Sequence, residues 1–286
     1  MFDQAHLAHY LQLWSLQQDG VAIHTHAACL LPVLHGGQPA MLKLSAGGDE
    51  RRAASVLRWW DGDGAVRVLA ASPDADADGY ALLLERVLAT RPLAGLAELA
   101  QLAQLAHAGE AGDAAATTIL CAVAARLHAP RPAPPPPLPA LSGCFAALAA
   151  AAALYGGVFS DCHAVAQDLL AAPQDSVVLH GDLHHANVLD GGARGWLAID
   201  PKGYVGERGF DFANLLCNPD AALATAPGRL QRQVALIAAA AQLDAARLLA
   251  WVVAWSGLSA AWHVEDGTPP QTALAVAAIA LAALHA

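Results

Sequence analysis

The segment VVLHGDLHHANVL places three histidines, an aspartate and an asparagine between two short apolar runs. His180, His184 and His185 with Asp182 have residue types that could bind a metal ion. In the alternative interpretation, Asp182 and Asn187 carry the chemistry, and the first histidine braces the loop. The Gly-Asp pair between the histidines makes a regular helix unfavourable, so we favour the second interpretation.

A second carboxylate, Asp200, follows Asn187 by thirteen positions and ends the apolar run WLAI. Phosphoryl transfer needs a carboxylate that accepts the proton of a hydroxyl group. It also needs an amide oxygen and a second carboxylate that hold Mg²⁺ on the nucleotide phosphates. Mg²⁺ prefers hard oxygen ligands of these kinds. The spacing of Asp182, Asn187 and Asp200 therefore favours phosphoryl-transfer chemistry.

A lysine upstream suits the same chemistry. Lys43, in AMLKL, stands at the end of a predicted strand, where its ammonium group can pair with phosphates while its stem lies along apolar surface. Glu50, at the head of the next predicted helix, is the nearest acid that could hold this lysine. Asp49 beside it is the alternative.

The elements that must position these residues fall into two regions. In the first, residues 29–45 read as two strands around a Gly-Gly turn, and so predict a hairpin. Residues 49–60 begin with acids and carry apolar residues at helical spacing, which predicts a helix. Residues 65–71 and 80–87 read as further strands.

The second region begins after residue 88, where long alanine- and leucine-rich helices take over. The proline-rich stretch 129–141 cannot be helical beyond its edges, because proline lacks an N–H and fixes its backbone angle. We therefore predict an α+β fold, with a β-rich lobe over 1–88 and a larger, mainly helical lobe over 89–286. The motif around Asp182 falls in the second lobe, on a loop held by short strands.

Composition limits the partners. The chain has 286 residues, 56% of them apolar, but alanine runs supply much of this, so we expect buried helices and no membrane association. No basic region precedes an apolar stretch at the N-terminus, and the five cysteines form no CxxC pair, which predicts a cytoplasmic protein. A net charge of -10 argues against nucleic acid. It suits a cationic small-molecule substrate, or serves solubility alone.

Several further residues have two interpretations. Asp211, in GFDFANLL, could contact substrate, or could cap the following helix or hold the catalytic loop. Glu265 and Asp266 end a long apolar helix at the terminus that favours cations, so they could recruit a cationic substrate or lie in a solvated turn. For Trp59 and Trp60 we favour packing between the lobes over ligand stacking.

HGDLHHANVL with IDPKG, preceded by AMLKL and ALLLERV, resembles the aminoglycoside phosphotransferases, and within them the streptomycin 6-phosphotransferase and hydroxyurea phosphotransferase group. The resemblance implies a protein-kinase-like bilobal fold with ATP in the cleft. It implies that Asp182 is the catalytic base and that Asn187 and Asp200 bind Mg²⁺. It also implies that Lys43 contacts the nucleotide phosphates.

The segment from Glu85 to Val87 would be the hinge whose backbone meets adenine. The sequence departs from the protein-kinase pattern in having no glycine-rich phosphate loop near IHTHAACLL. The expected activity is ATP-dependent phosphorylation of a hydroxyl on a streptomycin-like aminoglycoside. The alternatives are a kinase for hydroxyurea or a metabolic amine or alcohol, and a nucleotide-binding protein without catalysis. The acceptor hydroxyl and the oligomeric state stay open.

Overall fold

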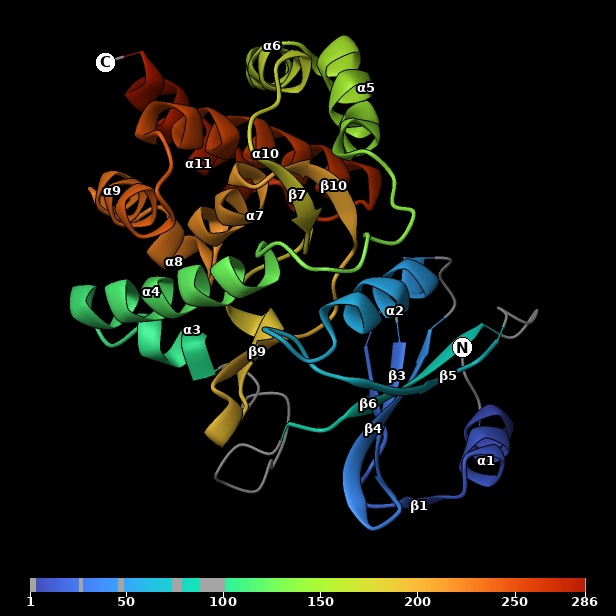
Figure 1. The fold of residues 1–286 in the computed structure, drawn as a ribbon. Coiled ribbons are helices and arrows are strands. Elements are labelled where there is room, and N and C mark those ends of the chain that lie inside the picture. The colour runs from blue at the N-terminus through green and yellow to red at the C-terminus, as the bar shows by residue number, and fades with distance from the viewer. Residues whose placement is uncertain (1–3, 26–27, 46–48, 74–78, 88–100, 286) are drawn as a thin grey trace.

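An antiparallel sheet forms the N-terminal part of the computed structural model (Figure 1). The structure describes residues 4–25, 28–45, 49–73, 79–87 and 101–285. Five strands run in the order β1-β3-β4-β6-β5, and β2 pairs with β3. Their bounds are β1 (Leu16–Gln18), β2 (Ile23–His24), β3 (Ala28–His35), β4 (Gln38–Ser45), β5 (Val68–Ala71) and β6 (Tyr80–Glu85).

The predicted hairpin is confirmed as β3 and β4, which pair over their full length. Gly36 and Gly37 both have positive φ, of 56° and 78°, the conformation that a two-residue hairpin turn needs. The predicted strands β5 and β6 are also confirmed. The aspartate-rich loop between them lies largely outside the described residues.

Two helices cover this sheet. The predicted helix over 49–60 is confirmed as α2 (Asp49–Trp60), which buries its apolar face and begins with two acids. Helix α1 (Gln4–Leu13) was not predicted. Its Leu7, Tyr10 and Leu11 pack against a cluster of buried strand side chains, so tertiary packing stabilises a helix whose own sequence is only weakly amphipathic.

The C-terminal part is mainly helical, as predicted. Its helices are α3 (Gln101–Ala106), α4 (Glu110–Leu127), α5 (Ala146–Tyr155), α6 (Val158–Ala171), α7 (Gly209–Ala213), α8 (Ala221–Ala224), α9 (Arg229–Ala241), α10 (Ala245–Glu265) and α11 (Gln271–Leu284). Two short sheets lie among them, β7 (Ser176–Leu179) with β10 (Tyr204–Glu207) and β8 (Val188–Asp190) with β9 (Trp196–Ala198). The boundary proposed at residue 88 falls at the edge of 88–100, outside the described residues, and stays a prediction.

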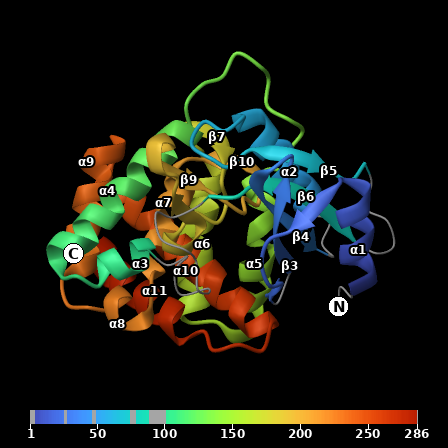
Figure 2. The ribbon, with the colours of Figure 1, turned by 90° about the horizontal axis from the view of Figure 1, so that it is seen from below.

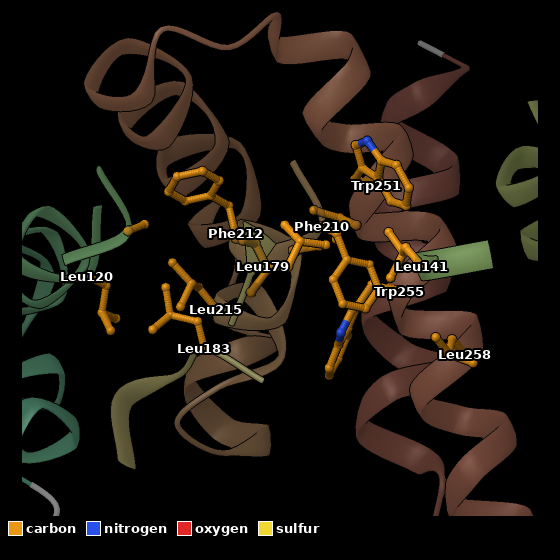
Figure 3. Packing of buried hydrophobic residues seen from close by; sticks show 14 of the residues in the cluster. Leu120, Leu141, Leu179, Leu183, Phe210, Phe212, Leu215, Trp251, Trp255 and Leu258 are labelled. Atoms are coloured by element: carbon orange, nitrogen blue, oxygen red, sulfur yellow. The ribbon is translucent and has the colours of Figure 1, made fainter. Parts of the chain in front are cut away.

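Helix α10 is the central element of the helical core, as its predicted burial requires. Figure 3 shows apolar side chains of α7, β7 and α10 packed together. The Phe210 ring meets Trp251 edge to face, with centroids 5.9 Å apart. Gly209 allows this approach, because a Cβ there would lie 2.5 Å from Trp251 Cδ1.

The proline-rich segment contains no helix between residues 129 and 140, as predicted, and in Figure 2 it arches away from the body of the protein. It begins where α4 ends and is anchored to the N-terminal part through Trp59, whose indole N–H donates to Ala133 O at 2.9 Å. The Arg131 guanidinium lies over the same indole, 4.9 Å from the ring centroid. Trp59 therefore packs between the two parts of the chain, as predicted.

Across the described ranges, no single helix has both the length and the apolar character needed to span a membrane. Helices α9 and α10 pass that test only as a pair, across a 119° bend.

Candidate active site

The loop 180–187 joins β7 to β8, and hydrogen bonds to Asp211 on α7 hold it in place. The Asp211 carboxylate accepts hydrogen bonds from the N–H groups of His180 and Gly181, each at 2.8 Å, and from His128 Nε2 at 2.9 Å. Its side chain is fully buried. Burial alone would raise the pKa of Asp211, but these hydrogen bonds and nearby His128 lower it below its ordinary value. The geometry matches the loop-holding interpretation of Asp211 and leaves its oxygens no access to a substrate.

His180 braces the loop from inside, as expected from the sequence. Its Nε2 lies 2.9 Å from Ile199 O, so it carries the proton, and Nδ1 accepts from the Asp182 N–H at 3.2 Å. Burial lowers the pKa of His180, which keeps the ring neutral in this arrangement. Trp60 stacks on the ring at 6.2 Å between centroids and donates to Leu127 O at 3.0 Å. Trp60 thus packs between α2 and the loop.

Gly181 adopts a φ of 83°, and a Cβ there would lie 2.8 Å from the Tyr204 ring. The turn therefore requires glycine just before Asp182.

The Asp182 carboxylate is held by two asparagines and remains partly exposed. Oδ1 accepts from Asn214 Nδ2 at 3.1 Å, and Oδ2 lies 3.4 Å from Asn187 Nδ2. Asn214 is held in turn by Asn218, whose Nδ2 lies 2.8 Å from Asn214 Oδ1. Asn214 was missed in the sequence. The signal was its spacing, because it follows Asp211 by three positions, about one helical turn.

The side chain of Asn187 is oriented by its own loop. Its Nδ2 donates to Asp182 O at 2.9 Å, which fixes the amide so that Oδ1 points away from this bond. Within the described ranges, Asn187 Oδ1 accepts no hydrogen bond. An oriented amide oxygen and the carboxylate of Asp200, which lines the same cavity, form a donor set that fits Mg²⁺.

Asp200 follows β9 by two residues, with a positive φ of 58°, which is uncommon for a residue other than glycine. Its Oδ1 lies 2.5 Å from Lys43 Nζ, and its Oδ2 lies 3.7 Å from Lys202 Nζ. Burial alone would raise the pKa of Asp200, but the charges of Lys43 and Lys202 lower it below its ordinary value. The carboxylate is therefore ionised at neutral pH.

Lys43 is shared between two carboxylates. Its Nζ also lies 2.6 Å from Glu50 Oε1, which identifies Glu50 as its acidic partner. The neighbouring Asp49 is exposed and pairs with Arg52. Burial alone would lower the pKa of Lys43, but the carboxylates of Asp200 and Glu50 raise it above its ordinary value.

Lys43, Asn187 and Asp200 open onto a cavity of about 400 Å³ between the sheet and the loop, whereas Asp182 is not among the residues that line it. Six of the predicted residues line it, namely Lys43, Glu50, Glu85, Val87, Asn187 and Asp200. The remaining wall is largely apolar and includes Leu30, Met41, Val66, Leu84, Leu189 and Ile199. An apolar slot with charged groups at one end has the properties of a small-molecule site.

At the predicted hinge, the Glu85 carboxylate is already engaged. It accepts from Arg67 N at 2.8 Å and pairs with Arg194. The N–H of Val87 makes no backbone hydrogen bond within the part of the chain that the structure describes.

Other predicted residues lie apart from the cavity. Glu265 and Asp266 are exposed at the C-terminal end of α10, and neither lines the cavity. His185 is buried, and burial with the nearby Arg229 charge lowers its pKa to about 3. Among the described residues, no three His, Cys, Asp or Glu side chains are grouped so that they could hold a metal ion.

The sheet, α2 and the loop 180–187 place the chain in the protein-kinase-like fold of small-molecule kinases. A choline/ethanolamine kinase family protein from Mesorhizobium loti matches with a TM-score of 0.60 at 14% identity, over 93% of this chain and 88% of that protein. The family model described as aminoglycoside/hydroxyurea antibiotic resistance kinase matches residues 13–267. The chain belongs to this family.

Two relatives of this chain are named for different substrates. A streptomycin 3''-kinase from Klebsiella pneumoniae is 45% identical over 262 residues, which is 90% of this chain and 92% of the relative. A hydroxyurea phosphotransferase from Kitasatospora aureofaciens is 35% identical over 286 residues, 96% of this chain and 78% of the relative. The family predicted from the sequence is confirmed.

Proposed function

We propose that this chain is an ATP-dependent kinase that phosphorylates the 3'' hydroxyl of streptomycin or a close analogue. The observation that carries the proposal is the convergence of Lys43, Asn187 and Asp200 on one cavity, with Asp182 at the turn of the same loop. The 45% identity to a streptomycin 3''-kinase supports the choice of substrate and of position.

For the nucleotide, the apolar part of the cavity would suit adenine, and the N–H of Val87, which lines the same cavity, would meet it. Lys43 would contact the phosphates, held in position by Glu50. Asn187 Oδ1 and the Asp200 carboxylate would hold Mg²⁺. The metal, when bound, neutralises charge on the phosphates.

Asp182 would orient the acceptor hydroxyl and accept its proton. Asn214 fixes Oδ1, so Oδ2 is the oxygen left to meet the substrate, with only a long contact to Asn187. The partial exposure of this carboxylate permits that approach. Catalysis then rests on positioning and electrostatic stabilisation, as is usual for phosphoryl transfer.

The acceptor would be cationic, since a streptomycin-like molecule carries positive charge and the chain has a net charge of -10. Glu265 and Asp266 stay candidate attractors of such a substrate, because both are exposed carboxylates. The hydroxyurea alternative is favoured by one relative at 35% identity.

The test is to incubate the purified chain with ATP and Mg²⁺ and separately with streptomycin, other aminoglycosides and hydroxyurea. ADP release and phosphorus NMR of the product would identify the substrate and the phosphorylated position. We expect a 3''-phosphate on streptomycin. Product with phosphate at position 6 would overturn the position, and turnover of hydroxyurea alone would favour the alternative substrate. Nucleotide binding without any transfer would favour the non-catalytic interpretation.

A further inference from the structure

His184 lies two residues after Asp182 and has one ring nitrogen committed to the loop. Its Nδ1 accepts from the Ala186 N–H at 3.2 Å, where His184 caps the short turn His185–Asn187. A nitrogen that accepts this bond carries no proton. The neutral ring therefore carries its proton on Nε2, and the backbone of the loop fixes which nitrogen is the donor.

The other nitrogen, Nε2, lies next to the Asp182 carboxylate. His184 Nε2 lies 3.8 Å from Asp182 Oδ1, too far for a hydrogen bond, and that oxygen already accepts from Asn214. Nε2 forms no hydrogen bond within the described ranges of the chain. The side chain is 21% exposed and the Asp182 side chain is 32% exposed, so neither is sealed from solvent. The charges of Asp182, Asp200 and Lys202 all act on this ring.

The two lysines at the site both lie beside the Asp200 carboxylate. Lys43 is paired with both Glu50 and Asp200, and Lys202 lies near Asp200 Oδ2. A phosphoryl group passing between Asp200 and Asp182 would travel past two carboxylates. A neutral hydrogen-bond donor on that path would stabilise the phosphoryl group, because hydrogen bonds directed at developing charge lower the barrier to its transfer.

We propose that His184 donates a hydrogen bond from Nε2 to the phosphoryl group during its transfer, with the ring neutral and its orientation fixed by Ala186 N–H. This role rests on the proposed kinase function. It makes His184 a catalytic residue rather than a loop brace, which is the role that His180 fills.

Two substitutions test the roles of the two His184 ring nitrogens separately. In His184→Asn, the amide oxygen reaches the position of Nδ1 and keeps the cap, since asparagine is a favoured capping residue, but the Nε2 donor is lost. In His184→Gln, the amide nitrogen reaches the position of Nε2, but the cap is lost. His35→Asn, in the exposed β3–β4 turn, serves as the matched control.

We expect His184→Asn to lower kcat by about 10²-fold, the usual effect of removing one such donor, with an unchanged melting temperature. His184→Gln should melt slightly lower yet keep kcat within about tenfold of wild type. A binding measurement provides the second readout. The preference for a non-hydrolysable ATP analogue over ADP should fall in His184→Asn and persist in His184→Gln and the control.

Wild-type kcat in His184→Asn would overturn the role. A lower kcat with an unchanged preference for the ATP analogue would also overturn it, because the donor would then serve Asp182 instead. If the wild-type protein transfers no phosphate to any acceptor, the proposed kinase function fails, and this result is distinct from both of those outcomes.

Discussion

Replacing Asp182 with asparagine separates catalysis from stability. The change keeps the size of the side chain and removes its negative charge. The amide oxygen of the variant can take the place of Asp182 Oδ1, which accepts a hydrogen bond from Asn214 Nδ2 at 3.1 Å. The second contact, from Asn187 Nδ2, is long at 3.4 Å, and Asn187 keeps its 2.9 Å bond to the main-chain oxygen of residue 182.

The expected loss of stability is therefore small. One long hydrogen bond is worth at most about 1 kcal/mol, which corresponds to a fall in melting temperature of roughly 2–4 °C for a chain of this size. Removing a general base lowers turnover by roughly 10²–10⁴-fold. At about 1.4 kcal/mol for each factor of ten, this adds about 3–5 kcal/mol to the barrier.

The assay measures ADP release with streptomycin at saturating ATP, together with calorimetric melting and ATP binding. Asp190→Asn is the matched control, because Asp190 lies in the adjoining strand and, among the described residues, its carboxylate accepts only the Gly192 N–H. We expect the control to retain full activity. Asp182→Asn that melts several degrees lower but phosphorylates normally per folded molecule would refute the assignment of this loop.

Three further predictions follow from the same contacts. Asp211→Asn should lower the melting temperature by roughly 5 °C, since an amide cannot accept from all three of its donors, and a calorimetric scan would test this. The pKa of Asp211 is lower in the folded than in the unfolded protein, so its contribution to the free energy of unfolding is full above pH ~4 and disappears as the pH falls through the folded-state pKa. The Asp211→Asn variant should therefore lose less stability on acidification than wild type. An equal loss would contradict this. Lys43→Ala should raise the KM for ATP at least tenfold in a protein that still folds, and unchanged turnover at limiting ATP would remove Lys43 from the site. Chelation of divalent metal should abolish turnover, and added Mg²⁺ should restore it. The Asn187→Ala variant should need a higher Mg²⁺ concentration for half-maximal turnover. A stoichiometric zinc that is lost on replacing His184 would contradict this assignment of the metal site.

The elements that the sequence predicted well are those set by local patterning. The β3–β4 hairpin follows from two apolar runs around Gly36 and Gly37, and α2 follows from its periodicity and its initial acids. The catalytic loop was placed correctly between two strands, because apolar runs flank a glycine and polar residues.

What the sequence left open depends on contacts between distant residues. Asp49 and Glu50 are adjacent and chemically alike, and only the helical phase of α2 turns Glu50 toward Lys43. The partners of Asp211 come from two segments far away in the chain, so local spacing favoured a holding role for this residue but could not identify what it holds. Helix α1 was missed because the cluster that it covers belongs to strands elsewhere in the sequence.

Helix α2 contacts both Lys43 and the loop 180–187. At its start Glu50 pairs with Lys43, and at its end Trp60 stacks on His180 and bonds to Leu127 O. Its 12 residues span about 18 Å at 1.5 Å per residue, so the helix acts as a spacer between the lysine and the loop that carries Asp182. A rotation of α2 would break the contacts at both ends together, because a helix turns as a unit. The length and phase of α2 therefore contribute to the distance between the lysine and the loop, together with the direct contact of Lys43 with Asp200, and a single residue inserted within α2 would disrupt the contacts at one or both of its ends.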